Sequence, residues 1–165
     1  MFLSKFEFAK VVSCSPLVSI DICILKGREL LLGKRINSPA KNFFFVPGGR
    51  ILKSELINNA LRRILKDELG LSIKKNHNNS QQYLGTYEHF YDDNFLDNKE
   101  FGTHYIVLAY LLPYESLETS REEIISQQHS KYIWLDIDKF KDNSLEIHCY
   151  TLDYLKNQIL INYLL

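Results

Sequence analysis

The chain has 165 residues, of which 45% are hydrophobic and 13% aromatic, a composition typical of a folded protein and not of a disordered one. Its 20 basic and 20 acidic side chains give a formal net charge of +0, which excludes a general electrostatic attraction to nucleic acid or to a membrane surface. A chain of this length is most simply one domain, residues 1–165, and is long enough to bury a core.

The N-terminal sequence and the cysteines bear on the compartment. Residues 1–5 lack the long apolar run of a signal peptide, and no segment approaches the ~20 apolar residues that a membrane-spanning helix requires. Cys14, Cys23 and Cys149 are odd in number and lack metal-ligand spacing, so we expect reduced thiols. The sequence therefore predicts a cytoplasmic protein without membrane partners.

The first half of the chain has the patterns of a small sheet followed by a helix. Leu17–Leu25 and Glu29–Lys34 are expected strands, joined by a hairpin turn at Lys26–Arg28. Phe43–Val46 is a short aromatic strand that ends at Pro47–Gly49. An amphipathic segment, Phe2–Phe8, precedes these strands.

Residues 54–69 predict an amphipathic helix. Ser54 is the candidate N-cap and Gly70 the C-terminal stop. Apolar residues recur at helical spacing, at Leu56, Ile57, Ala60, Leu61, Ile64 and Leu65.

Strand and helix patterns continue to the end of the chain without a linker. In order, we expect a loop at Lys74–Gln82, a strand at Gln82–Tyr91, a loop at Asp92–Gly102, strands at His104–Leu112 and Lys131–Leu135, a helical turn within Asp136–Lys141 and a closing helix at Thr151–Leu164. Mixed strands with helices outside them predict an α+β fold, an α/β/α sandwich around a mixed sheet.

One loop and helix carry a specific spacing. Gly49–Glu55, Arg63 and Asp67–Leu71 resemble the Nudix box, G-x5-E-x7-R-E-U-x-E-E-x-G-U with U aliphatic, at every fixed position but two. Ile64 stands in place of the first metal-binding Glu, and Asp67 in place of the next. Positions 64, 67 and 68 share one helix face, so this resemblance implies a loop and helix that hold a divalent metal against a diphosphate.

The two departures from the box reduce the number of acidic side chains that could bind a metal. Glu68 remains as the strong metal-ligand candidate, and Asp67 is weaker because its side chain is shorter. We therefore expect one catalytic Mg²⁺, completed by water, backbone carbonyl and substrate oxygens. The alternative is an ordinary amphipathic helix whose charges are solvated.

Outside the box, the sequence resembles GDP-mannose mannosyl hydrolases, a Nudix branch that also lacks the full set of box acids. The matching stretches are residues 1–3, Pro16–Asp21, Leu31–Arg35, Phe45–Arg50, His89–Phe95, Thr103–Tyr105 and Gln128–His129. The resemblance implies cleavage of GDP-mannose, and often GDP-glucose, to GDP and free sugar by water attack at the anomeric carbon with inversion. It also implies a homodimer, and metal ligands from the Gly48 carbonyl, Glu68 and Gln128.

Three arginines suit the diphosphate of such a substrate. Arg35, Arg50 and Arg63 offer forked donors to phosphate oxygens, which would stabilise the departing anion. Alternatively, Arg35 is a solvated charge at a hairpin end, and Arg63 pairs with an acid such as Asp67.

Water that attacks carbon needs a base. His129 follows the implied ligand Gln128, and histidine ordinarily exchanges its proton near neutral pH, so we expect it to be the general base. Asp21 lies in an apolar run, where an acid is costly unless paired; it contacts substrate, the catalytic cluster or a structural partner. His89 and Tyr105 either join this catalytic site or are core residues with a satisfied polar tip.

The nucleotide end is less defined. The resemblance implies that Phe2, Leu3 and Phe8 contribute to the nucleotide pocket, and aromatic faces do stack on bases, although such residues are usually plain packing. Tyr91 and Asp92–Asp93 could cover the sugar, or the two acids could form only a turn. His148 reads as an ordinary surface residue.

Two other classes of function remain open. A conventional Nudix pyrophosphohydrolase would use the same loop and helix to direct water at phosphorus, normally with more acids. A non-catalytic nucleotide-sugar-binding module would lack the base or metal ligands, whereas Glu68, Gln128 and His129 are all present. The sequence therefore favours an enzyme acting on a nucleotide sugar.

Overall fold

The computed structural model describes residues 3–77, 80–119, 129–139 and 145–164. Its elements in chain order are α1 (Lys5–Cys14), β1 (Leu17–Lys26), β2 (Glu29–Arg35), β3 (Phe44–Phe45), β4 (Gly48–Arg50), α2 (Ile57–Leu69), β5 (Leu71–Ile73), β6 (Gln82–Tyr91), β7 (Thr103–Pro113), β8 (Leu117–Thr119), β9 (His129–Asp136), α3 (Cys149–Leu155) and α4 (Gln158–Leu164). Short 3₁₀ helices lie at Lys75–His77, Tyr114–Ser116 and Ile137–Lys139. Within these residues, no helix is both long and apolar enough to cross a membrane.

Strand β1 organises a mixed seven-stranded sheet. The order is β3-β2-β1-β7-β6, with β4 also paired to β1 and β9 to β2. β1 runs parallel to β7 from Leu17 to Leu25 and antiparallel to its other neighbours. Its second edge pairs with β4 near the start and with β2 at the end, so Asp21 lies opposite Gly48.

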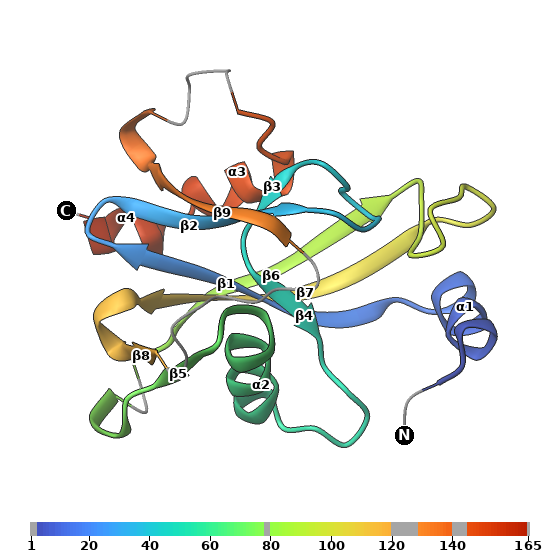
Figure 1. Ribbon diagram of the computed structural model, residues 1–165, viewed down its shortest axis with the longest axis horizontal. Coiled ribbons are helices and arrows are strands. Elements are labelled where there is room, and N and C mark those ends of the chain that lie inside the picture. Colours follow the sequence, from blue (N-terminus) through green and yellow to red (C-terminus); the bar gives the residue numbers. More distant parts are fainter. Residues whose placement is uncertain (1–2, 78–79, 120–128, 140–144, 165) are drawn as a thin grey trace.

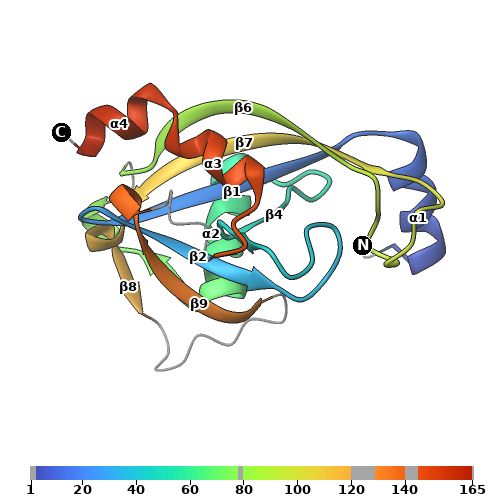
Figure 2. The ribbon, with the colours of Figure 1, turned by 90° about the horizontal axis from the view of Figure 1, so that it is seen from above.

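Helices cover both faces of this sheet (Figures 1 and 2). On one face α2 packs through Leu61 onto a cluster that includes Ile22. On the other, α3 and α4 bring Tyr154 and Leu160 onto a cluster that includes Cys23. Successive residues of β1 thus enter opposite cores, as the period of a strand dictates, and the predicted α/β/α sandwich around a mixed sheet is confirmed.

The box helix begins later than its sequence predicts. Ser54 has a φ of 64° and is not the N-cap; the helix starts at Ile57 after Leu56, which makes no side-chain cap. The reason is Glu55, whose Oε2 accepts a hydrogen bond from the Leu52 backbone N–H at 2.9 Å and shapes the preceding residues as a turn. The helix ends as expected at Gly70, in the left-handed conformation with a φ of 63°.

The predicted closing helix is two helices. Asn157 stands between them and its Oδ1 accepts the Ile159 backbone N–H at 2.8 Å, which starts α4 as an asparagine cap does. Its Nδ2 donates to the Leu84 carbonyl and the Tyr87 hydroxyl, both at 2.8 Å, and so ties the break to β6. The continuous prediction from Thr151 to Leu164 is therefore wrong at this residue.

A helix and a pair of short strands are absent from the sequence-based prediction. Helix α1 begins with a capping box, in which Ser4 and Glu7 satisfy each other's backbone N–H groups. Strands β5 and β8 form a separate antiparallel pair, with Leu71 opposite Thr119. Short elements of three residues carry too little periodicity to predict from one sequence.

Candidate active site

Two adjoining pockets open where β4 leaves the sheet, and they share Gly48, Gly49 and Arg50 as a common wall. The first pocket, of about 140 Å³, is lined by Asp21, Arg35, Phe45, His89, Tyr91 and Tyr105 among others. The second, of about 210 Å³, is lined by Arg63, Ile64, Asp67 and Glu68 of α2. The structure therefore gathers most of the sequence-predicted site residues around one strand.

The two acids at the end of α2 differ sharply in position. The Glu68 side chain is 8% exposed, whereas that of Asp67 is 62% exposed and reaches Arg63 only at 3.9 Å. Ile64 fills the space where the box has another acid: a Cβ on Gly49 would lie 3.2 Å from Ile64 Cγ1. Both acids line the second pocket, and Glu68 is the buried one.

The donor atoms here fit a sparsely ligated Mg²⁺. Among the described residues, Glu68 Oε2 has no hydrogen-bond partner, and no three His, Cys, Asp or Glu side chains gather as a metal cluster. One carboxylate beside the Gly48 backbone leaves most coordination positions to water and substrate, as is usual for Mg²⁺. Gln128, the third implied ligand, lies outside the described residues, so the ligand set stays a prediction.

His129 packs against Glu68. Its Nδ1 lies 3.3 Å from Glu68 Oε2 and 3.1 Å from the Tyr132 hydroxyl, and its side chain is 1% exposed. Gly33 of β2 makes room for the imidazole, because a Cβ there would come within 2.6 Å of ring carbon Cγ. The ring is not part of the lining of either pocket, and its role as general base stays a prediction.

The hydrogen bonds of Tyr132 identify the tautomer of His129. The Tyr132 hydroxyl donates its single proton to the Glu68 backbone carbonyl at 3.0 Å. It can therefore only accept from His129, whose Nδ1 must carry the proton. In the neutral ring the lone pair is then on Nε2, a buried atom outside the lining of both pockets.

Arg63 holds the loop that precedes α2 in place through hydrogen bonds. Its Nε and Nη2 donate to the two Glu55 carboxylate oxygens at 2.7 and 2.9 Å, and Nη2 also donates to the Arg50 carbonyl at 2.8 Å. These hydrogen bonds lower the pKa of Glu55 and raise that of Arg63. Glu55, and not Asp67, is thus the main partner of Arg63, and its contact with phosphate stays a prediction.

A buried polar group lies behind the first pocket. Asp21 Oδ2 accepts a hydrogen bond from the Tyr154 hydroxyl at 2.6 Å, and the same hydroxyl lies 3.3 Å from His89 Nε2. Burial raises the pKa of Asp21 to about 6, opposed by the Tyr154 hydrogen bond and the Arg35 charge. Burial, with the nearby His148, lowers the pKa of His89 to about 4, and its ring stacks on Tyr150 at 4.0 Å.

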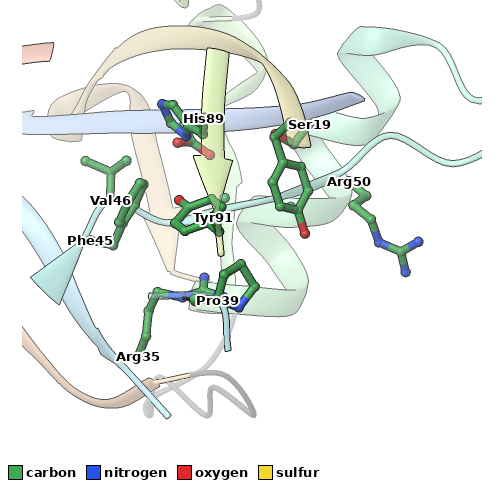
Figure 3. A pocket seen from close by; sticks show the side chains of 12 residues that line it. Ser19, Arg35, Pro39, Phe45, Val46, Arg50, His89 and Tyr91 are labelled. Atoms are coloured by element: carbon green, nitrogen blue, oxygen red, sulfur yellow. Dashed lines mark hydrogen bonds between the residues drawn. The ribbon is translucent and has the colours of Figure 1, made fainter. Parts of the chain in front are cut away.

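Figure 3 shows Phe45, Tyr91 and Arg35 gathered around the first pocket, with His89 above them. The Arg35 guanidinium is held in place because its Nε donates to the Pro39 carbonyl at 2.8 Å. Tyr91 and Tyr105 contact each other edge to face, with ring centroids 6.2 Å apart. Burial raises the pKa of both phenols, so they remain neutral hydrogen-bonding groups.

Arg50 turns away from these residues, at the right of the view (Figure 3). Its guanidinium carbon lies 3.9 Å from the centroid of the Phe8 ring, and Phe8 also packs on Phe95 at 4.6 Å. Phe8 therefore contacts the pocket wall through Arg50, and Leu3 is 48% exposed. Phe2 lies outside the described residues, and a nucleotide-binding role for these N-terminal residues stays a prediction.

Several aromatic residues near the site are not apparent from the sequence. Tyr150 and Tyr154 come from α3, and Tyr132 comes from β9. His148, expected on the surface, is half-buried; it accepts the Tyr150 backbone N–H and packs on Phe45. A signal for Tyr154 does exist, since a buried acid such as Asp21 requires a donor, but the sequence does not say which.

Comparison with known proteins agrees with this geometry. A family model described as "NUDIX domain" matches residues 16–152. The chain is 38% identical over 104 residues to the low-salt glycan biosynthesis protein Agl8 of Haloferax volcanii, which covers 63% of each protein. It is 41% identical over 59 residues to ADP-ribose pyrophosphatase of Methanocaldococcus jannaschii, or 36% of this chain and 35% of that protein. Both matches thus span less than two thirds of the relative's length.

Solved structures resemble the fold. A MutT NUDIX hydrolase from Burkholderia pseudomallei superposes with a TM-score of 0.67 at 19% identity, over 87% of this chain and 98% of that one. A bifunctional NMN adenylyltransferase/ADP ribose pyrophosphatase from Francisella tularensis gives a TM-score of 0.65 at 17% identity, over 96% of this chain and 44% of that one. With the family match over most of its length and the shared fold, the chain belongs to the NUDIX domain family.

Proposed function

We propose that this protein is a Mg²⁺-dependent hydrolase of nucleoside diphosphate sugars, with GDP-mannose as its substrate and GDP-glucose as a second one. The products are GDP and the free sugar, formed by water attack at the anomeric carbon with inversion. The observation that carries this proposal is Asp21, a buried carboxylate in the wall of the first pocket.

The charges of the two pockets suit the two ends of such a substrate. A carboxylate repels phosphate but accepts hydrogen bonds from sugar hydroxyls, so Asp21 favours a neutral polyol in the first pocket. The second pocket holds Glu68, beside which Mg²⁺ would neutralise the charge of the diphosphate when bound. Arg35 lines the first pocket, and Arg50 belongs to the shared wall, where the leaving phosphate would lie.

The chain's residues then supply the remaining chemistry. The water oxygen bonds to C1 while the bond from C1 to the phosphate oxygen breaks, and its electron pair leaves with GDP. Arg35 and Arg50 stabilise that anion. His129 is the proposed acceptor of the water proton; its ring packs against Glu68, a lining residue of the second pocket, and lies outside the lining of both pockets.

A second candidate is hydrolysis at phosphorus, as in a conventional Nudix pyrophosphohydrolase. The burial of His129 against Glu68 favours it, because a ring in that position can orient the metal ligand without touching the sugar. The Methanocaldococcus jannaschii relative, named an ADP-ribose pyrophosphatase, also favours it. The name of the Haloferax volcanii relative, a glycan biosynthesis protein, agrees better with a nucleotide-sugar substrate.

Turnover of GDP-mannose in ¹⁸O-labelled water with Mg²⁺ separates these candidates. We expect the label in the released sugar, which is the result of attack at carbon. Label in a phosphate product would replace the proposal with the phosphorus mechanism. Binding without turnover of any GDP- or ADP-sugar would make the protein a nucleotide-sugar-binding module.

We also propose that the enzyme acts in the cytoplasm as a homodimer. All three cysteines are free in the structure, in keeping with a reducing compartment. Helix α1 leaves Phe6 69% exposed, an apolar surface that a second copy would cover.

A further inference from the structure

Tyr154 of α3 holds one oxygen of the Asp21 carboxylate. Its hydroxyl donates to Asp21 Oδ2 at 2.6 Å, across 133 positions of sequence. Asp21 lines the first pocket, whereas Tyr154 lies behind it, wholly buried in the core beneath α3 and α4. The Tyr154 hydroxyl therefore acts on the pocket through its hydrogen bond to Asp21.

The other oxygen of Asp21 faces Gly48. A Cβ on Gly48 would overlap Asp21 Oδ1, so that oxygen lies directly against the glycine at the start of β4. Gly48 is opposite Asp21 in the strand register and lines both pockets. With Oδ2 occupied by Tyr154, Oδ1 is the oxygen turned toward the shared wall.

The Tyr154 ring cannot easily move. It packs edge to face on Tyr87, with centroids 4.8 Å apart. Its hydroxyl donates to Asp21, so the hydroxyl oxygen is left to accept from His89 Nε2 at 3.3 Å. The hydrogen bonds thus run from His89 through Tyr154 to Asp21. A core that needed only packing would hold an apolar residue at position 21, because a buried carboxylate is costly even when paired.

We infer that Tyr154 is a positioning residue of the active site, which holds Asp21 Oδ2 so that Oδ1 accepts a hydrogen bond from a sugar hydroxyl of the substrate. This inference rests on the proposed function for the identity of the ligand. The hydrogen bond from Tyr154 of α3 to Asp21 of β1 does not depend on whether water attacks carbon or phosphorus.

A double-mutant cycle tests this role. Tyr154→Phe keeps the ring and removes the hydroxyl, and Tyr87→Phe is the matched control, since its hydroxyl contacts Asn157 and not Asp21. We expect Tyr154→Phe to lower kcat/KM by about 10- to 100-fold, the scale of a misplaced catalytic geometry. Tyr87→Phe should retain wild-type kcat/KM. Adding Tyr154→Phe to Asp21→Asn should cause no further loss, because both act through one group.

The cycle is run with whichever nucleotide sugar the wild-type protein hydrolyses, so attack at phosphorus would reject the proposed function and still test Tyr154. A crystal structure of Tyr154→Phe supplies a readout that needs no turnover: the Asp21 carboxylate is expected to rotate away from Gly48. Three results would each overturn the inference. They are losses of kcat/KM that multiply in the double variant, equal losses in Tyr154→Phe and Tyr87→Phe, and an Asp21 carboxylate that does not move in the crystal structure.

Discussion

Asp21 stands between two wholly buried residues of β1, Ile20 and Ile22, and its charge is costly there. Its pKa is about 6 in the folded protein against 3.8 as the ordinary value. Well below pH 3.8 the group is neutral in both states; as pH rises through 3.8 toward 6 the unfolded chain ionises first and stability falls. Above pH 6 the penalty is complete, about 3 kcal/mol for a shift of this size.

Asp21→Asn should therefore raise the free energy of unfolding at pH 8 by up to about 3 kcal/mol and by almost nothing at pH ~3. Urea unfolding at both pH values without metal measures the difference. His89, whose lowered pKa has the opposite effect, is common to both proteins and cancels. Asp136→Asn, at an exposed ion pair with Lys139, is the control. A variant less stable than wild type at pH 8 would mean that Arg35 and Tyr154 more than offset the burial.

The metal prediction concerns the two acids of α2. Glu68→Gln should reduce turnover far more than Asp67→Asn, because Glu68 is buried at the pocket and Asp67 is largely solvent-exposed. Removing a ligand or its close support typically costs ~10- to 100-fold in metal affinity or activity. Mg²⁺ titrations of both variants by activity and by calorimetry provide the measurement. Equal losses would reject a single-metal site built on Glu68.

His129→Gln tests the general base. Loss of base catalysis should lower kcat by ~10²–10⁴-fold while Mg²⁺ affinity and KM stay close to wild type. Tyr132→Phe is a matched comparison, because it removes the hydroxyl that accepts from His129 Nδ1 but leaves the imidazole. If His129→Gln instead weakens Mg²⁺ binding and lowers kcat only in proportion, the histidine orients Glu68, and the phosphorus mechanism gains support.

At the scale of the element, helix α2 buries an apolar face in the core and carries Glu68 near its C-terminal end. Ile64 is 1% exposed and packs against Gly49. Ile64→Glu, which restores the acid of the box, should lower the free energy of unfolding by about 2–4 kcal/mol through burial of an unpaired carboxylate. It should not raise turnover of GDP-mannose. Thermal unfolding with and without Mg²⁺, beside a steady-state assay, provides the check, and higher activity would show that a missing metal ligand limits the enzyme.

Elements with a strong period were predictable from the sequence. Strand β6 has the predicted bounds, Gln82–Tyr91, and β1 extends one residue beyond its prediction, to Lys26. The start of α2 was not predictable, because it depends on how the Glu55 side chain folds back onto the nearby Leu52 backbone N–H. The break at Asn157 was not, because its side chain bonds to the distant Leu84 carbonyl of β6. Helix α1 was missed although Ser4 and Glu7 have the spacing of a capping box.

The contacts of the site also divide into those that the sequence predicts and those that it does not. The loop from Gly49 to Glu55 and helix α2 are adjacent in sequence, so their motif can be recognised from the sequence alone. The hydrogen bonds from Tyr154 to Asp21 and from Tyr132 to Glu68 join residues 133 and 64 positions apart. No spacing rule encodes such contacts, which arise only when both faces of the sheet are packed.

At the scale of the whole molecule, β1 connects the two layers. Its register with β4 puts Asp21 beside Gly48, while its alternate residues reach α2 on one face and α3 on the other. The two pockets share Gly48, Gly49 and Arg50 at this crossing, so one ligand can extend from one pocket into the other.

Helix α1 exposes apolar side chains to solvent. Val12 is its buried residue, and the apolar side chains of Phe6 and Val11 are 69% and 38% exposed. Exposed apolar surface of this kind marks interaction sites, and we expect a second copy of the chain to cover it. Wild-type protein should therefore sediment at twice the chain mass of 19.4 kDa.

Phe6→Glu should shift this protein to the monomer, because dimerisation would bury the new carboxylate without a partner. Tyr163→Glu, at an exposed aromatic residue of α4, should leave the dimer intact and serves as the control. Analytical ultracentrifugation across a range of concentrations measures all three proteins. A monomeric wild type, or a Phe6→Glu variant that remains dimeric, would place any self-association away from α1.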